Sequence, residues 1–331
     1  MQKTELPSTK TSIRISVRDL ERFAKSWLLD SEIRQLSPGT IANRSLIISK
    51  FVWFLKQNEI AECGTLEVRE FLAYVSNGHD AKEGRFGNDS LRRKVKPSTV
   101  HMYFARLRTF FGFLILEGAI DVSPMEALRP PVCRPDQIQP FSQEQAERLV
   151  NQAKRSTHPR RDEAIVLFLL DTGVRASELC GVQMKDMDLQ GRRCNVLGKG
   201  GKVRAIYFGR DTTRALWQYL KESPREPEEF LFVSDRGTCA TDPLTRSGLL
   251  QLIVRLGRAA KIEATRCSPH TFRHTFAIEF LRAGGNIFSL MNILGHTDMK
   301  MTNKYVALAQ ADIANQHRQF SPADRLRGSR R

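Results

Sequence analysis

The chain has 331 residues, of which 41% are hydrophobic and 27% are charged, as expected of a globular protein large enough for two domains. Its formal net charge is +16 at pH 7, and Lys and Arg exceed Asp and Glu in both halves, 1–140 and 141–331. A polyanion that touches both halves would explain this excess, and nucleic acid is the commonest such partner. A basic protein without such a partner is the plainer alternative.

The hydrophobic and cysteine patterns argue against several other classes. No stretch approaches the roughly 18 consecutive apolar residues of a membrane span, and the N-terminus shows no apolar signal region. The six cysteines are scattered without a C-x-x-C pair, which argues against a structural zinc site and against a disulfide framework. We therefore expect reduced cysteines, no membrane association and a cytoplasmic protein.

The N-terminal part is predicted to be helical. Four segments carry apolar residues at three- and four-residue spacing: 17–29, 38–57, 66–75 and 97–116. The polar stretch 77–96 ends in a basic run, and it could follow a phosphate backbone or simply be solvated. Five prolines then fall within 121–140. Because proline lacks an amide donor and restricts the residue before it, this stretch is predicted to be an extended linker.

The part after the linker is predicted to combine helices with a small sheet. Ser142 and Gln145 form a capping box at the start of one helix, and 162–170 is a strongly apolar second helix. Two short strands are expected on either side of the glycine-rich turn 198–201. Further helices are predicted to begin near Thr212, Thr245, Pro269, Asn286 and Met301. The predicted fold is mainly α with a small antiparallel β-sheet, in two domains.

Two basic motifs offer candidate phosphate ligands. In D-T-G-V-R-A-S-E-L a glycine ends one helix, and Arg175 stands near the start of the next. Arginine is always charged and its forked donors suit phosphate oxygens, although most arginines near helix starts are surface charges. In G-K-G-G-K, Lys199 and Lys202 stand at a β-turn tip that could reach into a groove, or could simply be exposed.

A third motif, S-P-H-T-F-R-H-T-F-A, predicts an anion site at a helix N-terminus. Ser268 suits the N-cap and Pro269 the first helical position. His270 and Arg273 then share one face at the helix end that carries partial positive charge and free amides. His270 and His274 also have a metal-ligand spacing, but the motif lacks the accompanying Glu and an obvious third ligand. We therefore predict no metal, and expect His274 to pack or to make a supporting hydrogen bond.

The last motif, L-G-H-T-D-M-K-M-T-N-K-Y, contributes His296 and Tyr305. A lone tyrosine in a helix is usually a packing residue, and its hydroxyl, with an ordinary pKa near 10, is a poor nucleophile. Cations that stabilise the phenolate and neutralise a phosphate would change this. Taken with the arginine, lysine and His-x-x-Arg motifs, the set predicts transesterification at a phosphodiester, with neither a metal nor a nucleotide cofactor.

Each member of this set has an expected role. Arg175 and Arg273 would hold the nonbridging phosphate oxygens and stabilise the charge that builds in the pentavalent transition state. Tyr305 would attack phosphorus in line, and Lys199 would protonate the leaving 5′ oxygen. The histidine of the His-x-x-Arg motif would accept the tyrosine proton or hydrogen-bond the phosphate. The histidine of the last motif would donate to the same oxygens.

These motifs resemble those of the tyrosine recombinases, also called the phage integrase family, which includes the Xer-type recombinases. T-G-V-R-A-S-E-L resembles the first-arginine motif, and L-G-K-G-G-K-V-R resembles the β-hairpin lysine motif. H-T-F-R-H-T-F-A matches the H-x-x-R box, and L-G-H-T-D-M-K-M-T-N-K-Y matches the final box. The resemblance covers about 141–307, and four boxes in order make it specific. The catalytic residues that it implies are Arg175, Lys199, His270, Arg273, His296 and Tyr305.

The resemblance also implies a two-domain DNA clamp. Its parts would be a helical core-binding (SAM-like) DNA-binding domain over 1–120, the linker over 121–140, an α+β catalytic domain over 141–320 and a basic tail over 321–331. Double-stranded DNA is the implied partner, bound by a homo-tetramer on two DNA sites, with a monomer or dimer off DNA. The candidate DNA contacts are basic side chains of both domains: Arg44, Arg92, Arg93, Lys94, Lys96, Arg106, Lys202 and Arg204.

The implied function is site-specific recombination through a 3′-phosphotyrosine intermediate, which serves integration, excision, transposition or resolution. The implied source is a bacterial or phage-encoded protein at the nucleoid. A type IB topoisomerase-like nicking and closing enzyme and a DNA-binding protein without catalysis are the alternatives. A metal-dependent nuclease using His270 and His274 would need paired carboxylates, which do not accompany them.

Overall fold

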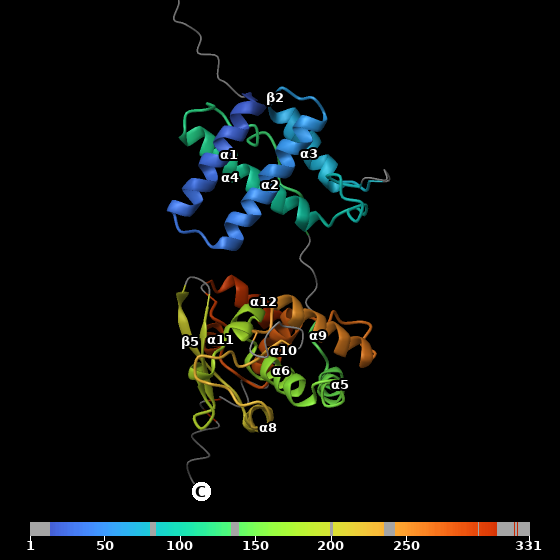
Figure 1. The fold of residues 1–331 in the computed structure, drawn as a ribbon, viewed down its shortest axis with the longest axis vertical. Helices are drawn as coiled ribbons and strands as arrows, with labels where there is room; N and C mark the ends of the chain where they lie inside the picture. Colours follow the sequence, from blue (N-terminus) through green and yellow to red (C-terminus); the bar gives the residue numbers. More distant parts are fainter. Residues whose placement is uncertain are drawn as a thin grey trace, which may run out of the picture. The chain divides into compact units, whose positions relative to one another are not determined.

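The computed structural model describes residues 14–79, 84–133, 139–198, 201–234, 242–296 and 298–309, together with Ser321 and Ala323. The chain divides into two compact units, Met1–Asp136 and Gln137–Arg331, each with its own hydrophobic core (Figure 1). Most of the predicted basic tail, 321–331, lies outside the described residues. None of the described helices is both long enough and apolar enough to cross a membrane.

The N-terminal unit contains the four predicted helices and one small sheet. The helices are α1 (Val17–Ile33), α2 (Pro38–Gln57), α3 (Thr65–Ser76) and α4 (Pro97–Leu116). The strands β1 (Ile15–Ser16) and β2 (Glu62–Cys63) pair antiparallel. Local sequence sets the helix starts, because the Ser16 and Ser37 side chains accept from amides of the first turn, and prolines occupy the first turns of α2 and α4.

Aromatic side chains fill the core of this unit. Phe51, Phe71 and Phe110 are fully buried, and the Phe51 and Phe71 ring centres lie 4.9 Å apart. The predicted linker differs from the structure at its beginning. Met125 is buried in this core although we expected it in an extended connection, so the linker begins further along the chain. The physical reason is that Met125 is an apolar anchor among the prolines, and burying it is favourable.

The basic loop between α3 and α4 is anchored at Arg85 and Phe86. The Phe86 ring lies edge-on against Tyr74, with ring centres 5.4 Å apart, and its amide donates to the Tyr74 hydroxyl. The buried Arg85 guanidinium donates to the carbonyl oxygens of Asn77 and Arg93 at 2.6 and 2.9 Å. The described part of this loop is therefore held against the N-terminal unit by these contacts, and the basic side chains from Arg92 to Lys96 remain exposed.

The C-terminal unit is an α+β domain, as predicted. Its first part comprises α5 (Gln143–Ala153), α6 (Pro159–Thr172), α7 (Ala176–Gly181), the 3₁₀ turn η1 (Met184–Asp186) and the strands β3 (Met187–Asp188), β4 (Arg193–Leu197) and β5 (Val203–Tyr207). Its second part comprises α8 (Arg210–Glu222), α9 (Arg246–Ala259), α10 (Pro269–Arg282), α11 (Ile287–Leu294) and α12 (Lys300–Ala309). The sheet is antiparallel in the order β3-β4-β5, and Cys194 pairs with Ile206.

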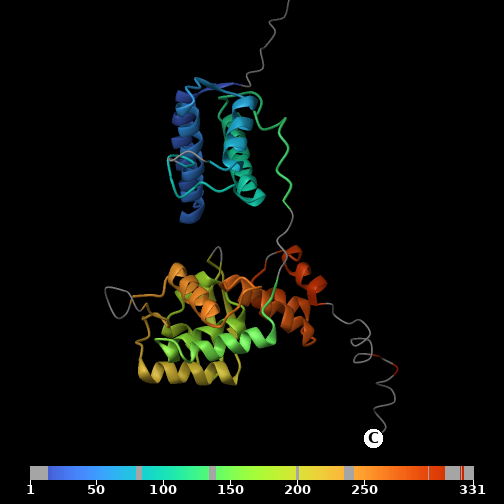
Figure 2. The same ribbon diagram turned by 90° about the vertical axis from the view of Figure 1, so that its right-hand side faces the viewer.

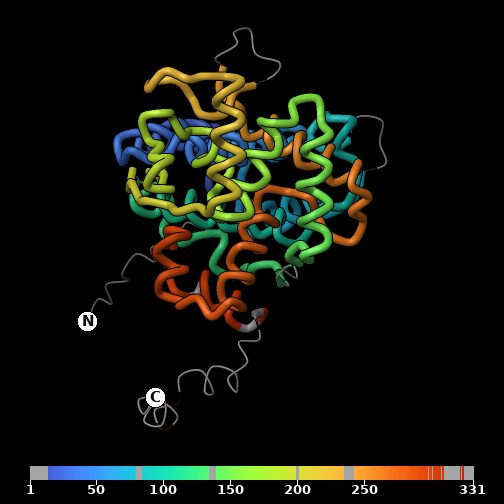
Figure 3. Tube along the Cα trace, turned by 90° about the horizontal axis from the view of Figure 1, so that it is seen from below, coloured from blue at the N-terminus to red at the C-terminus, as the bar shows by residue number. Residues whose placement is uncertain are grey.

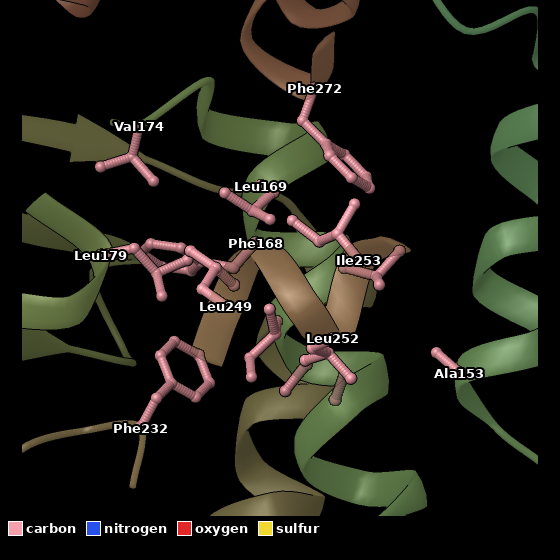
Figure 4. Close-up of a cluster of buried hydrophobic side chains, with 14 of the residues drawn as sticks. Ala153, Phe168, Leu169, Val174, Leu179, Phe232, Leu249, Leu252, Ile253 and Phe272 are labelled. Carbon is pink, nitrogen blue, oxygen red and sulfur yellow. The ribbon is translucent and has the colours of Figure 1, made fainter. Parts of the chain in front are cut away.

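Helix α6 lies at the centre of this unit, against α5, α8 and α10. Its Phe168 and Leu169 side chains are fully buried beside residues of α7 and α9 (Figure 4). In Figure 2 the helices α11 and α12 (red) lie at the opposite end from the α9 start, and Figure 3 shows them at the edge of the unit. This edge carries the last two sequence motifs and a small apolar cluster of its own around Leu290 and Leu294.

We expect Phe168→Ala to lower the free energy of unfolding of the C-terminal unit by about 3–5 kcal/mol, because it leaves a cavity in a close-packed core. Phe168 is fully buried, and its ring centre lies 5.8 Å from that of Phe208. Urea unfolding followed by circular dichroism measures the loss. The matched control is Phe288→Ala, whose side chain is exposed and should shift the midpoint little.

Candidate active site

Three arginines meet at the C-terminal end of α11. Gly295 ends the helix in the left-handed region (φ 63°), which glycine adopts without steric cost. The carbonyl oxygens of residues 293–295 accept, in chain order, from Arg204 Nε at 2.7 Å, Arg273 Nη2 at 2.7 Å and Arg175 Nη2 at 3.2 Å. A helix C-terminus carries unpaired carbonyl groups and partial negative charge. This short segment therefore fixes three cations that come from β5, α10 and the start of α7.

Glu178 is the carboxylate partner of this arginine cluster. It is buried and accepts from Arg175 Nη1 at 2.7 Å and from Arg204 Nη1 and Nη2 at 2.8 and 2.9 Å. It also accepts from the Arg175 amide, which closes a capping box on α7. Burial alone would raise the pKa of Glu178, but the hydrogen bonds from Arg204 and Arg175 outweigh it and lower the pKa to about 2. Glu178 was not among the predicted site residues, although it has the capping-box spacing from Arg175.

Arg273 and His296 form a buried pair whose proton positions follow from the contacts. Arg273 Nη2 lies 2.8 Å from His296 Nε2. Because a guanidinium group only donates, Nε2 accepts, and the ring proton of His296 lies on Nδ1, which donates to Thr302 Oγ1 at 2.8 Å. Burial and the neighbouring Arg273 lower the pKa of His296 to about 4, so the ring is neutral at pH 7. The predicted donation from His296 Nε2 to a phosphate therefore requires Arg273 to leave Nε2 and a proton to reach that nitrogen.

Tyr305 lies inside the same chain, against these residues. Its side chain is 1% exposed and packs with Leu290 and Leu294. Its hydroxyl lies 2.8 Å from His274 Nδ1, and its ring stacks on the His296 ring with centres 6.3 Å apart and planes at 11°. Burial raises the pKa of Tyr305, and Arg273 opposes this shift. The hydroxyl is therefore protonated at neutral pH and lies in a field of positive charge.

The structure brings four of the six predicted catalytic residues into one hydrogen-bonded and stacked group: Arg175, Arg273, His296 and Tyr305. His270 is exposed on the first turn of α10, and partial desolvation and Arg273 lower the pKa of this ring. Lys199 lies outside the described residues. Arg273 stays charged at neutral pH, although burial and Arg175 lower its pKa to about 10.

Two of the predicted DNA contacts turn inward, which corrects their assignment. Arg204 donates from Nε to the Ile293 carbonyl oxygen and from Nη1 and Nη2 to the Glu178 carboxylate. It therefore supports the arginine cluster. Arg44 is buried, donates to Ser31 Oγ at 2.5 Å, and lies over the Trp27 ring, 4.5 Å from its centre. Each arginine contacts acceptors or an aromatic ring within its own unit. The spacing of residues along the sequence does not reveal such contacts.

The other predicted DNA contacts keep surface positions. Arg106 is half-buried and donates to Asn43 Oδ1 at 3.0 Å. The remaining five side chains are exposed: Arg92, Arg93, Lys94, Lys96 and Lys202. Four of these follow the anchored part of the basic loop between α3 and α4.

Comparison with known proteins decides the family. The model of the phage integrase family matches residues 139–312. Tyrosine recombinase XerD of Listeria monocytogenes serotype 4b (strain F2365) is 30% identical over 297 residues, which cover 87% of this chain and 94% of that protein. The chain belongs to the phage integrase family. This chain is also 30% identical over 278 residues to tyrosine recombinase XerC of Xanthomonas campestris pv. campestris (strain B100). The match covers 83% of this chain and 80% of that protein.

Solved structures share the fold of this recombinase. The Tn1549 transposon integrase in complex with transposon right end DNA gives a TM-score of 0.68 at 20% identity, covering 92% of this chain and 99% of that one. The XerH recombinase bound to a palindromic difH substrate gives 0.64 at 18% identity, covering 93% and 85%. At this identity the likeness concerns the fold alone.

We expect Glu178→Gln to destabilise the recombinase by about 3 kcal/mol near neutral pH, because it leaves two partly buried arginines without their carboxylate. The folded pKa of Glu178 is depressed to about 2, so its contribution to stability is present above its ordinary pKa of 4.5 and is lost as the pH falls toward 2. Urea unfolding between pH 7 and pH 2.5 should show a shallower acid loss in the variant than in the wild type.

The matched control for this substitution is Glu279→Gln. Glu279 forms a 2.8 Å ion pair with Arg282, but both side chains are about half exposed. A solvated pair of this kind contributes little, so the control should keep wild-type stability within about 1 kcal/mol. Equal stability of Glu178→Gln and the control would contradict the central place of Glu178.

Proposed function

We propose that this recombinase cuts and rejoins DNA at specific sites through a 3′-phosphotyrosine intermediate formed by Tyr305. The observation that carries the proposal is that, within one chain, the Tyr305 hydroxyl lies 2.8 Å from His274 Nδ1 and the Tyr305 ring stacks on His296, which contacts Arg273 of the arginine cluster. The Tyr305 oxygen would bond to phosphorus as the bond from phosphorus to the 5′ oxygen breaks. Attack by a second 5′ hydroxyl on the phosphotyrosine would reseal the strand and release the tyrosine.

The charge of the cluster supports a phosphate ligand. Arg175 and Arg204 donate to the carboxylate of Glu178, and Arg273 donates to the neighbouring Leu294 carbonyl, so these four residues carry two more positive charges than negative ones. Burial is the largest cause that lowers the pKa of Arg273, and repulsion from Arg175 adds to it. Arg175 and Arg273 would hold the scissile phosphate, whose charge relieves this repulsion and grows in the transition state.

Two further residues complete the proposed chemistry. Lys199, which comes between β4 and β5 in the sequence, would protonate the leaving 5′ oxygen. His270 is exposed at the N-terminus of α10, where free amides and partial positive charge favour an anion, and it would hydrogen-bond the phosphate. The likeness to tyrosine recombinases over most of the chain does not favour the topoisomerase alternative or a DNA-binding protein without catalysis.

We also propose double-stranded DNA as the partner of both units, with a homo-tetramer on two sites and a monomer or dimer off DNA. Both units are basic, and the Tn1549 integrase, which shares this fold, is described in complex with DNA. The exposed run from Arg92 to Lys96 would contact phosphates, because Arg85 and Phe86 anchor the loop beneath it. The site of action would be the nucleoid in the cytoplasm of a bacterium.

We expect Tyr305→Phe to abolish the covalent protein–DNA adduct on a nicked suicide duplex while leaving DNA binding intact. The duplex carries a binding site selected from a random-sequence pool, and the reaction contains EDTA. Denaturing gel electrophoresis detects the adduct. Tyr207→Phe is the matched control, because the Tyr207 side chain is exposed on β5, and it should react like the wild type. An adduct formed by Tyr305→Phe would refute the nucleophile.

We expect Arg93→Ala to weaken DNA binding and to reduce the slope of log affinity against log salt by about 1, as for one lost phosphate contact. Titration of labelled duplex at several salt concentrations measures the slope. Arg160→Ala is the control, because Arg160 is exposed but donates to Glu222 and Gln218 on α8. An unchanged slope for Arg93→Ala would contradict a phosphate contact by this part of the basic loop.

A further inference from the structure

We propose that His274 is a catalytic residue whose Nδ1 accepts the phenolic proton of Tyr305 during attack on phosphorus. The inference rests on the proposed role of Tyr305 as the nucleophile. It assigns to His274 the proton acceptance that we predicted for His270 as one of two possible roles, the other being a hydrogen bond to the phosphate. His274 follows Arg273 directly in α10, so the same helix would supply a phosphate ligand and the proton acceptor.

The geometry places one proton acceptor on the reacting oxygen. The Tyr305 hydroxyl lies 2.8 Å from His274 Nδ1, and the two ring centres lie 5.5 Å apart. Among the described residues, His274 is the hydrogen-bond partner of the Tyr305 hydroxyl. Because Tyr305 is 1% exposed, bulk water does not reach this side chain to take its proton. A general base must lie within hydrogen-bond reach of the proton that it removes, and His274 does.

Neighbouring side chains are less suited to the same step. His296 stacks on the Tyr305 ring, but its Nε2 accepts from Arg273 and its Nδ1 carries the proton donated to Thr302. Lys304 Nζ lies over the Tyr305 ring, 5.2 Å from its centre, where a cation stabilises phenolate but offers no lone pair. Of these three side chains, His274 is the one that hydrogen-bonds the Tyr305 hydroxyl.

The surroundings of His274 keep its lone pair free in the resting protein. Burial comes first, and Lys304, His270 and Arg273 follow, in lowering the pKa of His274 to about 4. The neutral ring carries one proton, and in the tautomer with this proton on Nε2 the lone pair of Nδ1 accepts the phenolic hydrogen. A phosphate bound at Arg273 adds negative charge beside these cations, which makes His274 more basic when the substrate is present.

The proposed step balances in protons and bonds. The Tyr305 O–H bond breaks, the proton bonds to His274 Nδ1, and the tyrosine oxygen bonds to phosphorus. The bond from phosphorus to the 5′ oxygen breaks, and the proposed acid Lys199 protonates that oxygen. On resealing, a 5′ hydroxyl gives its proton to the deprotonated Lys199 as its oxygen bonds to phosphorus, the bond from phosphorus to tyrosine breaks, and His274 returns its proton to the tyrosine oxygen.

Two substitutions of His274 separate proton transfer from positioning. His274→Asn places an amide near the Nδ1 position, so it keeps a hydrogen bond to Tyr305 but does not accept a proton. His274→Ala removes both functions. In single-turnover cleavage of the suicide duplex, we expect both variants to be slowed by about 10²–10⁴-fold, which is the usual range for general acid–base catalysis, with unchanged DNA affinity and melting temperature.

A more acidic nucleophile tests the same step from the other side. Fluorotyrosine incorporated at position 305 loses its proton more easily, so it should recover part of the rate of His274→Asn while changing the wild-type rate much less. Cleavage by His274→Asn within about threefold of wild type would overturn proton acceptance and leave a positioning contact. Cleavage by His274→Ala at the wild-type rate would overturn both roles.

The outcome is distinguishable from failure of the proposed function. If Tyr305→Phe forms no adduct and His274→Asn cleaves normally, Tyr305 stands as the nucleophile and His274 is not its base. If Tyr305→Phe still forms the adduct, the nucleophile lies elsewhere and both proposals fail. Should His274→Ala melt early, the rate of His274→Asn and its response to fluorotyrosine decide the question.

Discussion

The end of α11 is the constraint on which the site depends. Three successive carbonyl oxygens, which the helix cannot satisfy by itself, each accept from a different arginine. The left-handed Gly295 ends the helix so that His296, the next residue, contacts Arg273. Segments that are far apart in the chain therefore share one anchor. The proposed phosphate ligands and the segment leading to the proposed nucleophile are positioned by the same few atoms.

The arginine cluster holds more positive charge than its own carboxylate balances. Glu178 is held ionised by Arg175 and Arg204, with its pKa near 2, whereas Arg273 is made less basic by burial and by Arg175. Burial, and after it the neighbouring positive charges, keep His296 and His274 neutral, each with its pKa near 4. A preorganised field of this kind costs stability in the free protein. It is relieved by an anion, which is what a DNA backbone supplies.

The burial of Tyr305 connects this field to the chemistry. A tyrosine among apolar side chains keeps its proton, and its raised pKa prevents a premature phenolate. The hydroxyl lies 2.8 Å from His274 Nδ1, so the proposed attack would begin with the proposed base already in contact with the proton. The rest of the C-terminal unit, built around the close-packed α6, holds α10 steady enough for this pairing to be specific.

The sequence by itself predicted most of the helices, the strands β4 and β5, and Arg175, Arg273, His296 and Tyr305 as one candidate set, because capping residues and motif spacing act over a few residues. The strands β1, β2 and β3 were not predicted. The sequence also did not determine the partners of those four side chains. Arg175 meets Gly295 across 120 positions, and this separation carries no local signal. For that reason Glu178 was missed, Arg44 and Arg204 were wrongly placed toward DNA, and Met125 was expected outside the core. Only tertiary packing decided that an arginine turns inward, since that depends on which carbonyl, carboxylate or ring the fold brings within reach.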